Sequence, residues 1–162
     1  RDRAMMIVSD TSSITSLFQI QRLGMLNDLL GIITITPAVK RELYAMEEQA
    51  AVIDQLDWIQ VVGPNDQKMV LNLLETLDLG EAESIALALE QQAQLLVIDE
   101  FQGRKVALAH GIKIVGVLGL LIQGKQRGLI ASVKHEIEQL KSIGFRLNQG
   151  LVDDVLGKLG EK

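Results

Sequence analysis

Two aspartates follow apolar runs that are typical of buried strands. Asp10 comes after "MMIVS" and Asp99 comes after "QLLVI". In an open parallel sheet, ligands bind outside the carboxyl ends of the strands, so both carboxylates are expected at one edge. An aspartate in a turn is ordinary, but two like charges at the same edge repel and raise each other's pKa. We therefore expect a positive group to offset them.

Glutamates on predicted helices could join the two aspartates. Glu42, in "PAVKREL", borders the core-facing side marked by Val39 and Leu43. Glu81 and Glu83, in "LGEAES", fall in the first turn of a helix, where the macrodipole alone favours an acid by ~0.3–1 kcal/mol. Each glutamate has an ordinary structural explanation. Taken with the aspartates, however, they allow four carboxylates from separate segments to converge at the strand ends.

Such a cluster would suit Mg²⁺ or Mn²⁺, since these hard cations prefer oxygen ligands and keep several waters. The chain has no cysteine, and neither of its two histidines is near these acids, which argues against zinc. A divalent ion beside a phosphodiester polarises the phosphoryl oxygen and lowers the pKa of bound water. The pattern therefore points to hydrolysis of a nucleic-acid backbone.

Length and composition indicate one domain with a sizeable core, since the chain has 162 residues of which 48% are apolar. No apolar run approaches the ~20 residues of a membrane span. The lack of cysteine excludes disulfides, thiolate metal sites and cysteine nucleophiles. With no signal-peptide h-region, a cytoplasmic address is expected, and Met5 or Met6 is the expected natural start.

The charge is unevenly distributed along the chain. Residues 1–100 carry 6 basic and 16 acidic side chains, whereas residues 101–162 carry 10 basic and 5 acidic ones. An acidic half could hold a metal while a basic half contacts a phosphate backbone, although plain surface variation is the alternative. The basic set is either a solvated helix face or an RNA-binding rim, and it comprises Lys125, Arg127, Lys134 and Lys141. The few aromatic residues argue against a sequence-reading platform for single strands.

The elements that must position these residues alternate between strands and helices. Apolar runs predict strands at 5–9, 32–36, 58–62, 94–99 and 112–116, with helices between them and two or three more from Val117 onward. This order predicts an α/β protein with a mainly parallel sheet and helices on both faces. Ser12 or Ser13 is expected to cap the first helix, and Gly24 to interrupt it. The helices of residues 130–159 are expected to form an appendage on one flank.

These motifs together resemble PIN-domain proteins, small metal-dependent ribonucleases that include many toxins of toxin–antitoxin pairs. The resemblance rests on "IVSDTSSI", "AVKREL", "LGEAESIALA" and "LLVIDEFQGRKVALAHGIKIVGVLGLL". The last two stretches are similar to a subgroup described only as predicted nucleic-acid-binding proteins. The resemblance implies a three-layer α/β/α fold with a sheet of about five strands. It places a nuclease domain at 5–124 and a helical extension at 125–162, packed on the same domain.

The resemblance also implies roles for the acids. By position, Asp10 and Glu42 take the first two acidic roles, Glu81 or Glu83 the third, and Asp99 the fourth in a Mg²⁺ or Mn²⁺ site. Thr11 or Ser12 corresponds to the polar group that supports the first acid. RNA would be the substrate, and a toxin would have an antitoxin partner. Homodimers are common in the family, and "ITSLFQI" and "GVLGLLI" could supply an apolar patch.

One departure puts catalytic activity in question. Many relatives have Thr-Asp-x-Asp after the fourth strand, whereas this chain has "VIDEFQGR", in which Glu100 directly follows Asp99. Arg104 could clamp a phosphate or pair with Glu100. The alternative function is therefore a catalytically weak PIN-like module that binds RNA or a protein. Receivers and haloacid-type phosphatases are disfavoured, because Lys113 is misplaced for the former and Asp10-Thr11-Ser12 lacks the Asp-x-Asp of the latter.

Overall fold

Five short strands form one sheet in the computed structural model, which describes residues 5–162. The prediction that the natural chain starts at Met5 or Met6 depends on residues 1–4, which lie outside that range. All neighbouring strands are parallel and the order is β3-β2-β1-β4-β5. The predicted parallel sheet is confirmed, although each strand is shorter than the apolar run that predicted it. The strands are β1 (Ile7–Ser9), β2 (Ile33–Ile35), β3 (Ile59–Val61), β4 (Leu95–Val97) and β5 (Ile114–Val115).

The strand order reverses between β1 and β4. The chain runs from β1 outward through β2 to β3, then returns to place β4 and β5 on the other side of β1. Val8 of β1 is therefore opposite Thr34 of β2 and Leu96 of β4. In open α/β sheets this reversal leaves a crevice at the carboxyl ends of the two central strands. Asp10 follows β1 directly, and Asp99 follows β4 by two residues, so both lie at that crevice.

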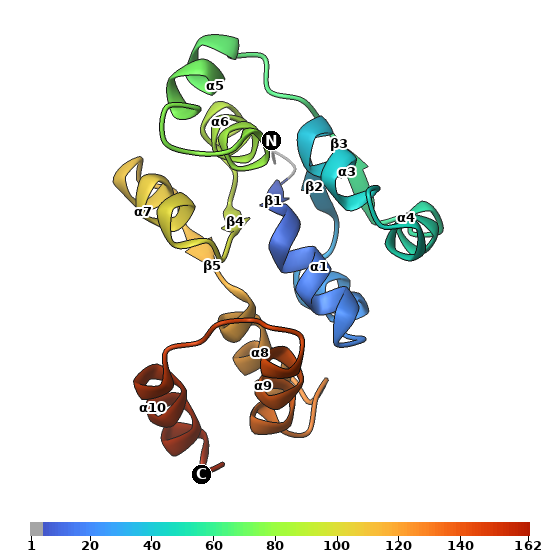
Figure 1. Ribbon diagram of the computed structural model, residues 1–162, viewed down its shortest axis with the longest axis vertical. Coiled ribbons are helices and arrows are strands. Elements are labelled where there is room, and N and C mark those ends of the chain that lie inside the picture. The colour runs from blue at the N-terminus through green and yellow to red at the C-terminus, as the bar shows by residue number, and fades with distance from the viewer. Residues whose placement is uncertain (1–4) are drawn as a thin grey trace.

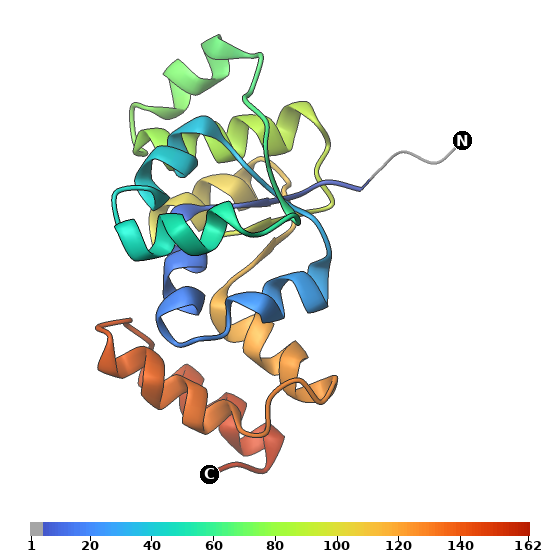
Figure 2. The same ribbon diagram turned by 90° about the vertical axis from the view of Figure 1, so that its right-hand side faces the viewer.

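The helices of residues 5–162 cover the two faces of the sheet in separate groups (Figures 1 and 2). Side chains that alternate along a strand point to opposite faces. Ile7 and Val97 belong to a core shared with α1, α2 and α8, whereas Val8, Leu96 and Ile98 belong to one shared with α5, α6 and α7. This confirms the three-layer α/β/α architecture. The helices are α1 (Thr11–Gln19), α2 (Leu23–Leu30), α3 (Pro37–Leu43), α4 (Glu47–Asp54), α5 (Gln67–Leu73), α6 (Leu79–Glu90), α7 (Phe101–Ala109), α8 (Val117–Gln126), α9 (Val133–Ser142) and α10 (Gln149–Leu159).

The last two helices lie beyond α8 at the end of the molecule away from α5 and α6 (Figure 1). Ile137 of α9 and Val152 of α10 are nevertheless buried in the same core as α1 and α8. The chain end is held by Glu161, whose carboxylate accepts hydrogen bonds from Ser132 Oγ at 2.8 Å and Val133 N at 3.0 Å. It also pairs with Lys125 Nζ at 2.5 Å. No helix in the described part of the chain is both long and apolar enough to cross a membrane.

Local details differ from the sequence predictions. Asp10, not a serine, caps α1, because its side chain accepts the Ser13 N–H. The break before α2 falls at Gln21, whose φ is 62°, and Gly24 lies inside α2. Most apolar side chains of "ITSLFQI" and "GVLGLLI" fill the core, whereas Leu118 and Ile122 are half-buried and line a hollow at the surface. Ile14, Leu17, Leu120 and Leu121 are all fully buried.

Candidate active site

Asp10 is held by hydrogen bonds at the carboxyl end of β1 and is only 3% exposed. Its Oδ1 accepts the backbone N–H of Ser13 at 3.0 Å, which caps α1. Its Oδ2 accepts from Ser12 Oγ and from the backbone N–H of Asp99, both at 3.2 Å. The capping role therefore leaves the carboxylate fixed in one position beside β4.

Asp99 lies next to Asp10 but directs its carboxylate toward α8. Both oxygens accept the Val117 N–H, at 3.0 and 3.3 Å, where α8 begins. Ser13 Oγ donates to Oδ2 of Asp99 at 2.7 Å, so Ser13 links the two aspartates through its backbone and its hydroxyl. Asp99 therefore helps to hold the carboxylate of Asp10 in its position.

The N-termini of α6 and α7 bring two more glutamates to the crevice. Glu81 forms a capping box with Asp78, which caps α6 through the Glu81 N–H at 2.8 Å. Glu100 caps α7 by accepting the Gly103 N–H at 2.9 Å. Glu81 and Glu100 face each other across these helix ends, so both carboxylates lie at one opening of the surface.

Glu42 reaches the same opening from α3, where its side chain is exposed. It accepts a hydrogen bond from Thr11 Oγ1 at the start of α1. Its carboxylate also lies over Gly80, where a Cβ atom would come within 2.5 Å of Glu42 Oε1. The absence of a side chain at Gly80 therefore leaves room for Glu42 beside α6.

Glu83 points elsewhere. Its Oε1 accepts the backbone N–H of Ala38 at 2.9 Å, in the first turn of α3. The structure therefore puts Glu81 at the opening and uses Glu83 to join α6 to α3. The ambiguity between these two residues could not be resolved by counting positions along the sequence.

These side chains surround a hollow of about 400 Å³, here called the acid hollow. Its lining combines five carboxylates with three hydroxyls and includes no basic side chain. The lining residues are Asp10, Thr11, Ser12, Thr15, Glu42, Asp78, Glu81 and Glu100. Sequence reasoning missed Asp78 and Thr15, although the D-x-x-E spacing of Asp78 and Glu81 is a capping-box signal that could have identified Asp78.

Burial and mutual repulsion disfavour the ionised forms of these acids. Burial, with a further contribution from the charge of Asp99, raises the pKa of Asp10 to about 6. Burial and the charges of Asp78 and Glu100 raise the pKa of Glu81 to about 7. Burial also raises the pKa of Asp99, although the hydrogen bonds from Ser13 and Val117 and the charge of Arg104 oppose that effect. A cation in the acid hollow would relieve this repulsion.

The donor chemistry of the acid hollow suits a hard divalent cation, because all its polar side chains offer oxygen. Within residues 5–162, however, no three His, Asp or Glu side chains stand close enough to hold an ion jointly as they are placed here. Mg²⁺ keeps several waters and needs only one or two direct carboxylate ligands. Asp10, Glu42, Glu81 and Glu100 are the residues that could hold the ion, directly or through such waters.

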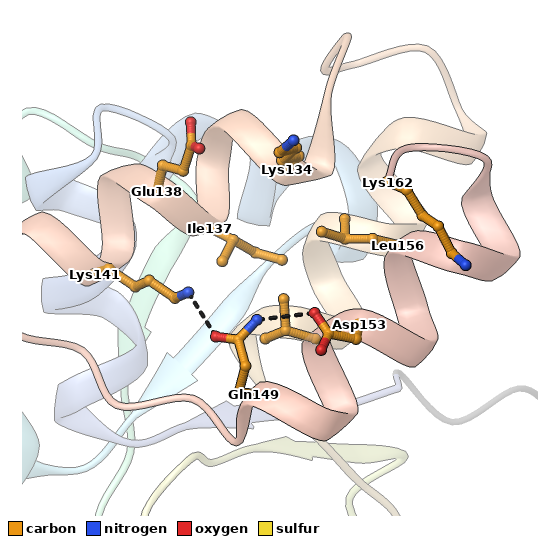
Figure 3. Close-up of a pocket in the computed structure, with 9 residues that line it drawn as sticks. Lys134, Ile137, Glu138, Lys141, Gln149, Asp153, Leu156 and Lys162 are labelled. Atoms are coloured by element: carbon orange, nitrogen blue, oxygen red, sulfur yellow. Dashed lines mark hydrogen bonds between the residues drawn. The ribbon is translucent and has the colours of Figure 1, made fainter.

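The basic residues considered above do not gather at the acid hollow. Arg104 Nη1 donates to the carbonyl of Ile98 at 2.8 Å and faces Asp99, so the pairing with Glu100 is not formed here, whereas the phosphate contact stays a prediction. Lys125 pairs with Glu161. Lys134 and Lys141 line a separate hollow between α9 and α10, which shares no lining residue with the acid hollow (Figure 3). There Lys141 Nζ donates to Gln149 Oε1, and Gln149 Nε2 donates to Asp153 Oδ1. These polar side chains of the hollow are therefore hydrogen-bonded to one another.

The fold is that of an α/β protein with an acidic hollow at the point where the strand order reverses. The PIN-domain family matches residues 6–161. Because that match covers nearly the whole chain, the chain belongs to the PIN-domain family. PIN domains are generally nucleases and typically use divalent metals, so a nucleic-acid hydrolase is the class of activity that the family supports. No curated protein matches the chain.

Proposed function

We propose that this chain is a Mg²⁺- or Mn²⁺-dependent endoribonuclease that hydrolyses phosphodiester bonds of single-stranded RNA. The observation that carries the proposal is the acid hollow itself, in which five carboxylates share one opening with no basic side chain to neutralise them. Its place at the reversal between β1 and β4 is where open α/β sheets bind ligands. Unbalanced carboxylates at a ligand site are the arrangement that a divalent cation stabilises.

The proposed roles follow from the contacts. Asp10, Glu42 and Glu81 are the metal-holding and catalytic acids, with Glu100 closing the hollow and Thr11 and Ser12 orienting the carboxylates. Asp99 completes the catalytic set by fixing Asp10 through its backbone N–H. The bound ion would polarise the phosphoryl oxygen and lower the pKa of the attacking water. In the metal-free chain the pKa of Glu81 is raised to about 7, and a bound cation would favour its ionised form.

The test is cleavage of a pool of single-stranded RNAs by the purified chain in Mn²⁺, with EDTA as the metal-free arm. Asp10→Asn should abolish cleavage while circular dichroism shows the fold intact, since Asn caps helices about as well as Asp. Asp99→Asn should lower cleavage less, because it keeps the backbone N–H that holds Asp10. Asp66→Asn is the matched control, because Asp66 caps α5 in the same manner but lies outside the acid hollow. If the wild-type chain cleaves no RNA and calorimetry detects no divalent-ion binding, the enzyme proposal fails.

A second candidate, a catalytically weak module that binds RNA or a protein, is favoured by two observations. Asp99 is committed to the start of α8, and the described acids do not converge as a ready-made group of three. RNA binding that persists in EDTA, without any cleavage in Mn²⁺, would identify this module and exclude the nuclease.

The partners are part of the same proposal. If the chain is the toxin of a toxin–antitoxin pair, an antitoxin segment should cover the acid hollow and inhibit cleavage. Co-purification with the product of a small neighbouring gene would reveal it. Homodimerisation is proposed because homodimers are common in the family, and light scattering would measure the oligomeric state. A cytoplasmic location remains a prediction from the sequence.

A further inference from the structure

Phe101 is a large apolar side chain left in solvent directly beside the acid hollow. It is 75% exposed, the highest value among the large hydrophobic residues that the structure describes as exposed. Phe101 is the first residue of α7, and the preceding residue, Glu100, lines the acid hollow. Consecutive Cα atoms are about 3.8 Å apart. The backbone of Phe101 is therefore next to an acid of the hollow, and no packing requirement of the fold explains the exposed ring.

Phe101 lines a second hollow, of about 590 Å³, which adjoins the acid hollow at residues 99–101. We call it the side groove. Its walls come from α7, from β5 and the start of α8, and from the segment that leads into α10 (Figure 1). Leu151 of α10, which is 50% exposed, also lines it. The side groove thus presents an exposed ring and apolar walls.

The charges of the side groove are opposite to those of the acid hollow. Arg104 and Arg146 line it, and Arg146 is exposed. Its single acidic lining residue, Asp99, has its carboxylate engaged by Ser13 Oγ and by the Val117 N–H. A polyanion whose scissile phosphate lies at the metal-holding acids needs cationic contacts nearby, and in the lining of the acid hollow there are none. The side groove supplies them.

These observations select single-stranded nucleic acid over a second copy of the chain. In a two-fold contact the same patch stands on both sides, so the positive charge of Arg104 and Arg146 would be brought close to a second patch of the same charge. An unpaired base, in contrast, offers a π-face to an aromatic ring and a phosphate to an arginine. One ring cannot read a sequence, so the contact would be tolerant of base identity.

We propose that Phe101 is a base-stacking residue and that the side groove holds the strand flanking the scissile phosphate. This inference rests on the proposed function for the class of its ligand. Phe101 takes the base of a nucleotide adjacent to the acid hollow, while Arg104 and Arg146 contact the backbone that continues from it. Phe101 is thus a positioning residue, and the acids carry the chemistry.

The experiment measures binding and cleavage separately. Binding of a fluorescein-labelled, unstructured RNA oligonucleotide is followed by anisotropy with Ca²⁺ replacing Mn²⁺, and its cleavage is followed in Mn²⁺. The variants are Phe101→Ala, which removes the ring, Phe101→Leu, which keeps apolar area without a π-face, and Phe101→Tyr, which keeps the ring. Leu108→Ala is the matched control, because Leu108 is 59% exposed on the same helix and lies outside the side groove. The exposure of Phe101 makes loss of folding an unexpected outcome, which thermal unfolding checks.

Losing one stacked base weakens binding by roughly 5- to 150-fold. Phe101→Ala and Phe101→Leu should show that loss, mainly as a higher KM with kcat little changed, and Phe101→Tyr should restore it. Leu108→Ala should bind like the wild type. A 2-aminopurine placed beside the cleavage site should be quenched on binding by the wild type and not by Phe101→Ala.

Each other outcome has a distinct meaning. If the wild type cleaves RNA and Phe101→Ala binds equally well, the inference is wrong while the proposed function stands. If RNA binds through Phe101 but is never cleaved, the inference holds and the nuclease proposal fails. If Phe101→Ala changes the oligomeric state and not RNA binding, the side groove is an interface between copies and the inference is overturned. A wild type that binds no oligonucleotide overturns it as well.

Discussion

The metal-free protein should become more stable, not less, when the pH is lowered from 7.5 to 5. The reason lies in Asp10, whose pKa is raised from an ordinary 3.8 to about 6 in the folded chain. Between these two values the folded state binds a proton that the unfolded state does not, so protonation favours folding. The stabilisation is absent at pH 7.5 and grows as the pH falls through 6 toward 4.

The size of the effect follows from the linkage between pKa and stability. At pH 5 a carboxyl with these two pKa values adds roughly 1–2 kcal/mol to the free energy of unfolding compared with pH 7.5. Asp10 is 3% exposed, so solvent screens this contribution little. Other carboxyls titrate in the same range, and their contribution must be subtracted.

The assay is urea unfolding of EDTA-treated protein at pH 7.5 and pH 5, for the wild type and for Asp10→Asn. Asparagine cannot titrate, so the difference in pH dependence between the two proteins isolates Asp10. We expect the wild type to gain roughly 1–2 kcal/mol more than the variant on acidification. Asp66→Asn, at an exposed helix cap, should behave like the wild type. An identical pH dependence in wild type and Asp10→Asn would refute the account of Asp10 as a buried, destabilised carboxylate.

Three further predictions follow from named contacts. Glu81→Gln should weaken Mn²⁺ binding in calorimetry at least about tenfold, whereas Glu83→Gln, which can still accept the Ala38 N–H, should stay within about twofold of the wild type. Gly80→Ala should keep the fold, since Ala favours helices, but should displace Glu42 and weaken both Mn²⁺ binding and cleavage; unchanged affinity would show that Glu42 is not a ligand. Glu161→Gln should lower the melting temperature at pH 7. Burial acts to raise the pKa of Glu161, but hydrogen bonds from Lys125, Ser132 and two backbone N–H groups lower it to about 2, so its stabilisation is present above pH 4.5 and is lost as the pH falls toward 2. The gap between wild type and Glu161→Gln should shrink between pH 4.5 and 2, and a gap that is as large at pH 2 as at pH 7 would contradict this.

The sequence predicted the layers of the fold because strand and helix periodicity are local signals. The alternation of apolar runs with helical segments was enough to predict a parallel sheet covered on both faces. Strand order was not available in the same way, because it depends on which strand each crossover returns to. The reversal between β1 and β4, which places Asp10 beside Asp99, appears only in three dimensions.

The candidate site was predictable as a set of acids but not as a geometry. Asp10 was expected at a strand end, and the capping role was assigned to a serine, because Asp and Ser cap helices about equally well. Glu81 and Glu83 lie in the same helical turn, and only their contacts distinguish them. Glu81 faces α7 at the acid hollow, whereas Glu83 is hydrogen-bonded to the first turn of α3. The turn of Asp99 toward Val117 likewise depends on where α8 begins.

The most direct test of the central claim is a crystal structure of the chain with Mn²⁺, measured for anomalous scattering. We expect one strong anomalous peak in the acid hollow, within direct or single-water reach of Asp10, Glu42, Glu81 and Glu100. Glu83 should remain bonded to the N–H of Ala38. A crystal soaked in millimolar Mn²⁺ that shows no peak there, or a peak at Glu83 instead, would contradict the account.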